Sequence, residues 1–218
     1  MILPGAARLA PPRLTPARLV LVPALLALSV GLAGCITLFP KAKPEQLYRF
    51  DAQIQPAPSN ARPFTVRTGS VDFDRASSGD RIMTVDGDQV AYVADGRWAI
   101  PASQLFDEAM AHGFDQPGDA AQLVEPGQAA KAEYRLRVQV LHFEARYLSG
   151  QTAAPTIVVT VRASLDRQSD LALIGTQEFE AQVPAGENRI SAMVTAYDAA
   201  TSKVVGDLVA WVDAKGGS

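Results

Sequence analysis

The chain has few of the residues that build reactive or metal-binding sites. It contains one cysteine and two histidines in 218 residues, so it cannot form an internal disulfide. His112 and His142 show no metal-ligand spacing such as H-E-x-x-H. The sequence also has no G-x-S-x-G nucleophile elbow and no phosphate-binding P-loop. We therefore predict a protein with no enzymatic activity, no bound metal and no cofactor.

Positive charge and long apolar runs are also scarce. The formal net charge is −3, and the segment before Cys35 carries three arginines and no acid, so the remainder is more acidic still. Nucleic-acid binding needs a basic face, and we expect no nucleic-acid partner. No apolar run after Cys35 is long enough to span a bilayer. The part that follows has the length of one domain with a core of its own.

The N-terminus has the pattern of a bacterial lipoprotein signal. Three arginines precede the apolar run Leu19–Leu28, and small residues then lead to the tetrapeptide Leu32–Cys35. Basic, apolar and small-residue regions in this order are typical of a secretory signal. We predict that residues 1–34 form the signal peptide and that Cys35 is the lipidation site. Several acyl chains on this residue would anchor the protein stably to a membrane.

Two other interpretations of the N-terminus are an ordinary signal peptide with a coincidental cysteine and a short membrane anchor. Pro23 and Gly31 interrupt the apolar segment, which makes it a poor membrane span. The residue after the cysteine is Ile36 rather than aspartate, which resembles the outer-membrane address of known lipoproteins. We expect a lipid-anchored protein of the cell envelope that faces the periplasm at the outer membrane.

The rest of the chain divides into a tether, a domain and a tail. Residues 35–46 contain Pro40 and Pro44, which favour an extended tether. Residues 47–214 are expected to form a single domain, and residues 215–218 a disordered tail.

Alternating apolar and polar residues predict most of the strands. The clearest alternation covers residues 134–145, 156–165 and 173–183, which short polar connections would join as an antiparallel meander. Shorter strands are expected at 47–54, 64–68 and 121–124, with 70–73 continuing the second of these. Asp86-Gly87 predicts a hairpin turn between strands at 82–85 and 89–93, and Asp95-Gly96 predicts a further turn.

Two helices complete the expected fold. Pro101 favours a helix start, and the helix is expected over 102–112 with Gly113 as its stop. Apolar residues recur at helical spacing over 190–212, which predicts a long amphipathic helix lying across the meander. The predicted fold class is α/β (α+β): an antiparallel or mixed sheet with this long C-terminal helix and the shorter central helix packed on it.

The two tryptophans are either core residues or partner contacts. Trp211 lies on the apolar stripe of the C-terminal helix, which favours core packing. Trp98 lies where a loop enters a helix, and the sequence leaves its role open.

The layout resembles the ABC-type transport auxiliary lipoprotein family, which includes the outer-membrane lipoprotein of the Pqi system. The most specific part of the resemblance is Tyr92 followed by Arg97-Trp98-Ala99-x-Pro101. The early Tyr-Arg-Phe strand, the long strand over 136–143 and the C-terminal Ala-Trp pair agree with it.

The resemblance implies a role beside a transporter. Members accompany systems that pair an inner-membrane ABC permease with a periplasmic MCE-domain protein and move lipids or other apolar molecules. This protein would then be a non-enzymatic docking subunit whose partner is the MCE-domain protein. Tyr92, Arg97 and Trp98 are the candidate partner-binding residues, and the hairpin before Arg97 and the loops of the meander are candidate contact surfaces.

Three alternatives remain open from the sequence. The protein could itself carry a lipid in a cavity between sheet and helix, although a closed core is the simpler use of its apolar residues. It could be an envelope hydrolase, for which Glu178, Glu180 and His142 would be candidates. It could also form a homo-oligomeric ring through an edge strand.

Overall fold

The computed structural model describes residues 45–54, 62–124 and 131–217. Cys35, the signal segment and nearly all of the predicted tether lie outside these residues. The described part contains nine strands in one mixed sheet and two helices.

Three long strands form the expected antiparallel meander. They are β7 (Tyr134–Tyr147), β8 (Thr156–Arg167) and β9 (Leu173–Pro184). β8 pairs along its whole length with β7 on one edge and with β9 on the other. The prediction for these strands is confirmed, and the meander is the frame on which the other elements lie.

The second edge of β7 is shared by three short parallel strands. β2 (Phe64–Thr68), β3 (Asp72–Phe73) and β4 (Arg81–Asp86) pair in succession with the start, middle and end of β7. These parallel pairs make the sheet mixed, which is one of the two arrangements that the sequence allowed. β6 (Ala121–Leu123) pairs with β2 at that end of the sheet.

β5 (Gln89–Trp98) corrects the predicted turn at Asp95-Gly96, because the strand runs straight through both residues. β1 (Gln46–Tyr48) pairs with its last three residues, and the rest of the predicted strand over 47–54 is not in a strand. A Cβ atom at position 96 would lie 2.9 Å from the Ile190 side chain. Gly96 therefore permits close packing rather than a change of direction.

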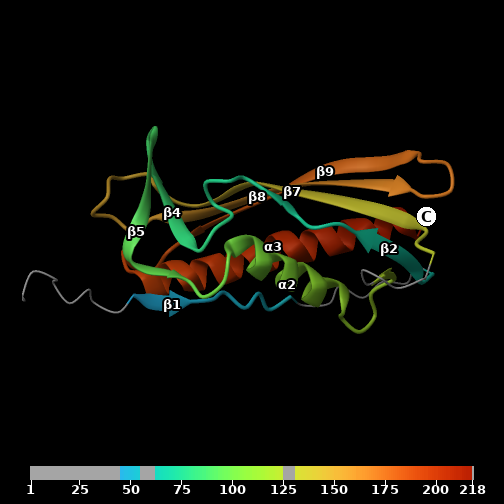
Figure 1. Cartoon of the computed structure of the whole chain (residues 1–218), viewed down its shortest axis with the longest axis horizontal. Coiled ribbons are helices and arrows are strands. Elements are labelled where there is room, and N and C mark those ends of the chain that lie inside the picture. Colours follow the sequence, from blue (N-terminus) through green and yellow to red (C-terminus); the bar gives the residue numbers. More distant parts are fainter. Residues whose placement is uncertain (1–44, 55–61, 125–130, 218) are drawn as a thin grey trace, which may run out of the picture. The chain divides into compact units, whose positions relative to one another are not determined.

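Both helices lie on the same side of the meander (Figure 1). α2 (Ala102–Phe114) continues one residue beyond Gly113, the predicted stop. α3 (Ile190–Gly216) packs on β8 and β9 as expected, and it extends past the predicted domain end at residue 214. The Tyr134 hydroxyl donates a 3.1 Å hydrogen bond to the carbonyl of Gly216, so the last helical turn belongs to the folded domain.

An aromatic cluster fills the core between β7, the start of α2 and α3. The ring of Tyr197 lies 4.7 Å from that of Phe143 and 5.1 Å from that of Trp98, and Phe50 packs 5.3 Å from Trp98. Such offset and edge-on pairs add to the free energy of burial.

Trp211 lies half-buried against the hydrophobic core, with its ring 5.9 Å from that of Phe179, which confirms its predicted packing role. No helix in the described ranges is both long and apolar enough to cross a membrane.

Candidate docking surface

The hairpin of β4 and β5 projects beyond the meander at the end of the sheet where β1 lies (Figure 1). Its turn contains Gly87, whose φ of +60° is the left-handed conformation that glycine adopts without cost. Val90 follows this turn and is 57% exposed. The hairpin therefore presents an apolar side chain at a position where it contributes little to the core.

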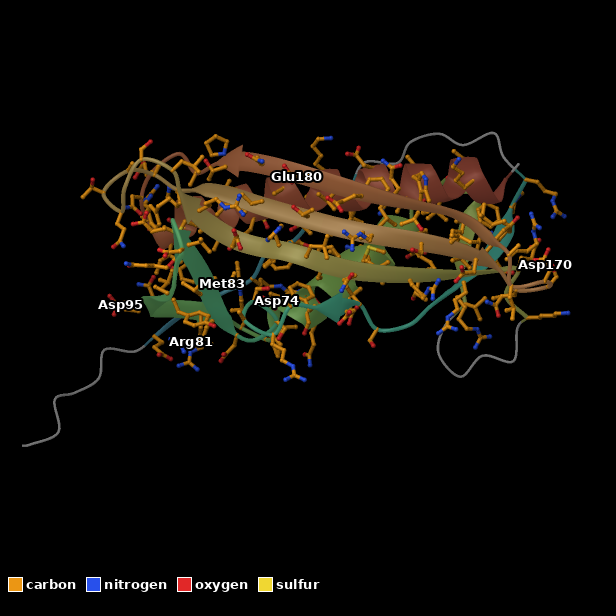
Figure 2. The ribbon with its side chains drawn as sticks, turned by 90° about the horizontal axis from the view of Figure 1, so that it is seen from above. Asp74, Arg81, Met83, Asp95, Asp170 and Glu180 are labelled. Atoms are coloured by element: carbon orange, nitrogen blue, oxygen red, sulfur yellow. The ribbon has the colours of Figure 1, made fainter. Side chains whose placement is uncertain are left out.

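Tyr92 braces the base of this hairpin. Its hydroxyl donates a 3.0 Å hydrogen bond to the backbone carbonyl of Ala76. The guanidinium carbon of Arg81 lies 3.8 Å from the centre of its ring, which is a cation–π contact. Figure 2 shows Arg81 at this end of the sheet, close to the position of Asp95. These contacts hold the half-buried tyrosine in one orientation.

Arg97 links three separate segments. Its guanidinium forms an ion pair with Asp80 at 3.1 Å and a second one with Glu45. All three side chains are partly exposed, so solvent screens the pairs and they contribute little to stability. Their effect is to fix the start of β1 next to the loop before β4.

Trp98 corrects one candidate, because it is not an exposed partner contact. Its side chain is 1% exposed, in the aromatic cluster, and its backbone N–H donates a 2.7 Å hydrogen bond to the carbonyl of Asp80. The register of β5 directs it inward, beside Arg97, which points outward. Trp98 therefore packs in the core beneath this surface and is not itself available to a partner.

A surface cleft of about 450 Å³ lies between β5, the end of β7 and the start of α3. The Tyr147 hydroxyl on its wall donates a 3.0 Å hydrogen bond to the side-chain oxygen of Asn188. Partial burial raises the pKa of Tyr147, and the nearby negative charge of Asp86 raises it further. The cleft is lined by neutral polar groups such as Tyr147 and Asn188, by apolar side chains such as Val93 and Met193, and by the charged residues Asp86, Asp95 and Arg189.

The residues of the hydrolase hypothesis lie on the open face of the meander. Glu178 forms an ion pair with Arg162 at 3.1 Å, and Glu180 accepts a 3.2 Å hydrogen bond from Thr160. Figure 2 shows Glu180 on the face away from α3. His142 lies beside Glu144, at 3.8 Å, and His112 lies in the last turn of α2. Among the described side chains, no group of three or more histidine, cysteine or acidic residues is placed to hold a metal ion.

Large exposed apolar residues occur at both ends of the sheet. Leu47, Val90 and Leu148 lie at the end that carries the β4–β5 hairpin. Leu171 and Leu173 lie at the opposite end, in and beside the turn 168–172 between β8 and β9. The sequence pattern missed this second group, because a leucine next to a polar turn is usually part of the following strand's buried face.

A model of the family described as ABC-type transport auxiliary lipoprotein component matches residues 47–209. The chain belongs to this family. The match confirms the resemblance inferred from the sequence and covers almost all of the described domain. It identifies the protein as an auxiliary lipoprotein component of an ABC-type transport system, attached to the cell envelope through lipid.

Solved structures agree with the fold of this auxiliary lipoprotein. The crystal structure of protein XCC0632 from Xanthomonas campestris is 19% identical, with a TM-score of 0.71 over 78% of this chain and 96% of that one. A second crystal structure, of an uncharacterized protein, is 13% identical, with a TM-score of 0.62 over 78% and 99% of the two chains. The search of curated proteins gave no match. At these identities the structures establish the fold alone.

Proposed function

We propose that this auxiliary lipoprotein is a non-enzymatic subunit that docks the periplasmic MCE-domain component of an ABC transporter for lipids or other apolar molecules. The observation that carries the proposal is the family match over residues 47–209. A subunit of this kind acts by holding its partner in place, so it needs a rigid surface and a membrane anchor. Cys35 would supply the anchor, at the outer membrane.

The β4–β5 hairpin is the surface that we assign to docking. It is exposed at its tip, and its base is fixed by the Tyr92–Ala76 hydrogen bond and by the ion pairs of Arg97. A surface that is already ordered loses little conformational entropy when a partner binds. The adjoining cleft beside Tyr147 could receive a side chain of the partner.

Packing between the sheet and α3 supports docking over the alternative of a lipid carrier. Val204, Val205, Leu208 and Val212 of α3 are fully buried, and they pack in one cluster with the inward side chains of β8. A bound acyl chain would have to displace these side chains from a core packed at the usual density. Docking requires no such rearrangement.

The test is affinity capture of the lipidated protein from detergent-solubilised envelopes, with identification of the captured proteins. We expect the MCE-domain protein together with its permease and ATPase. Val90→Asp should reduce their recovery at least tenfold without lowering the thermal unfolding midpoint. Gln177→Asp, which adds the same charge at an exposed position of β9, is the matched control and should leave recovery unchanged. Capture of stoichiometric lipid without any transporter protein would contradict the proposal.

A further inference from the structure

The turn 168–172 at the far end of the meander holds a leucine in an unfavourable conformation. Leu171 has a φ of +58° and is the one non-glycine residue with a positive φ among the described residues. In this region the Cβ atom crowds the backbone, so glycine, asparagine and aspartate are the residues usually found there. A bulky leucine at this position costs stability that a substitution would recover.

Local hydrogen bonds impose this conformation. The backbone N–H of Arg167 donates a 2.9 Å bond to the carbonyl of Ala172, which closes the turn. The Asp170 carboxylate accepts 3.2 Å bonds from the backbone N–H of Ala172 and from the Arg167 guanidinium. The N–H of Gln168 bonds the carbonyl of Glu133 at 2.8 Å, which fixes the turn to the start of β7. The turn is therefore a rigid feature of the domain.

Burial does not offset the strain at this turn. Leu171 is 76% exposed and Leu173 is 60% exposed, so neither leucine gains much from the core. Strain that persists at an exposed position is typical of a site whose side chain serves another purpose. A rigid turn therefore keeps two neighbouring leucines exposed to solvent, which is the arrangement expected of a contact site for a partner.

The charges beside the turn indicate the chemistry of that partner. Arg137 is paired with Asp166 at 2.9 Å, and Arg167 is paired with Asp170. Arg135 lies between them, opposite Asp166 in the register of β7 and β8, and its guanidinium forms no ion pair with any residue that the structure describes. An acidic group on the partner could pair with this cation.

We propose that Leu171 and Leu173 form an apolar knob that inserts into an apolar pocket, rimmed by acidic side chains, on the transporter's periplasmic component. This inference rests on the proposed docking function and adds a second contact to the β4–β5 hairpin. The turn lies at the opposite end of the sheet from β1 and the β4–β5 hairpin: Figure 2 shows Asp170 and Asp95 at opposite ends. The cation of Arg135 beside the turn favours a partner that presents acidic side chains around an apolar pocket.

The test compares the lipidated wild type with the double variant Leu171→Asn/Leu173→Asn in the same capture experiment. Asparagine suits the left-handed conformation and removes the apolar surface. We expect the thermal unfolding midpoint to stay constant or rise, and the recovery of the MCE-domain protein to fall at least tenfold. Gln177→Asn, at an exposed position within β9, is the control for an added asparagine and should leave recovery unchanged.

The outcomes separate the two proposals. Wild-type recovery by the double variant would overturn the knob and leave the docking function standing, whereas no capture by the wild type would overturn both. A lower unfolding midpoint would assign the leucines to stability instead. A membrane role is tested with the mature chain carrying Cys35→Ser and vesicles of phosphatidylethanolamine and phosphatidylglycerol. Flotation with these vesicles that the double variant loses would also overturn the protein-pocket proposal.

Discussion

Asp213, near the end of α3, accepts a 2.9 Å hydrogen bond from the backbone N–H of Ala121, the first residue of β6. Its second oxygen accepts a 3.2 Å bond from the N–H of Ala120. The carboxylate is 5% exposed, so it satisfies two backbone donors that the surrounding core hides from water. This contact ties the edge of the sheet to the long helix.

Replacing Asp213 should therefore destabilise the domain strongly. Asp213→Ala leaves two buried N–H groups without acceptors, which we expect to cost about 2–4 kcal/mol in the free energy of unfolding. Asp213→Asn retains one acceptor oxygen and should cost less. Urea unfolding measures both, and an unchanged midpoint for Asp213→Ala would show that the bonds carry no stability.

Asp119, in the loop before β6, should respond to pH in the unusual direction for a carboxylate. Burial raises its pKa, and the charge of Asp213 raises it further. A raised pKa means that the folded state favours the protonated form, so its stability contribution is full below the unfolded pKa of about 3.9 and is lost as pH rises through the folded pKa. Asp119→Asn should stabilise the protein at neutral pH, and this gain should vanish on acidification.

The measurement is the unfolding midpoint of wild type and Asp119→Asn across this pH range. Asp88→Asn, in the exposed hairpin turn at the other end of the sheet, controls for the change in net charge. A gain that is equal at all pH values would mean that the carboxylate's ionisation is not its cause.

Two helical glycines should respond oppositely to alanine. A Cβ atom at Gly113 would lie 2.6 Å from a methyl group of Val205, whereas the nearest atom at Gly206 is 3.9 Å away. Gly113→Ala should force α2 away from α3 and cost about 1–3 kcal/mol. Gly206→Ala should gain about 0.5–1 kcal/mol from helix propensity. Thermal and urea unfolding test the pair, and equal effects would refute the close crossing at Gly113.

Trp98 should affect stability and not docking. Its removal in Trp98→Ala empties space in the aromatic cluster and should cost about 3–5 kcal/mol in unfolding free energy. Val90→Ala, at the exposed hairpin tip, should cost less than about 0.5 kcal/mol. Binding measured at a temperature where both variants remain folded should fall for Val90→Ala only. Weaker binding by folded Trp98→Ala would contradict this prediction and show that Trp98 contributes to docking.

The alternation of residues 134–145 predicted β7 correctly because one face of that strand is buried and the other faces solvent. The turn predicted at Asp95-Gly96 was wrong. The glycine is needed there because the side chain of Ile190, which is distant in sequence, packs close to its backbone. For the same reason the sequence could not place Trp98, whose burial depends on Tyr197 of α3. Local patterns predict strands and helices, whereas such contacts depend on how those elements pack.

The sequence predicted the residues of the candidate docking surface less completely than it predicted the strands and helices. Tyr92 and Arg97 both belong to β5, where Met83 and Arg81 of β4 are their register partners, and their role in binding stays a prediction. The sequence shows Leu171 only as a leucine beside a polar turn. Its backbone conformation depends on hydrogen bonds from Gln168 to the carbonyl of Glu133 and from Arg167 to the carbonyl of Ala172, which form only in the folded chain. Lipidation of Cys35 also stays a prediction, since that residue lies outside the described ranges.

Native mass spectrometry of the lipidated protein, released gently from detergent-solubilised envelopes, addresses the docking function most directly. It reports bound proteins and bound lipids, with their stoichiometry, in a single measurement. We expect a complex that contains the MCE-domain protein, with no lipid on the auxiliary subunit beyond the acyl chains of Cys35. A protein free of transporter components that carries one lipid per chain would contradict docking and identify a cargo carrier.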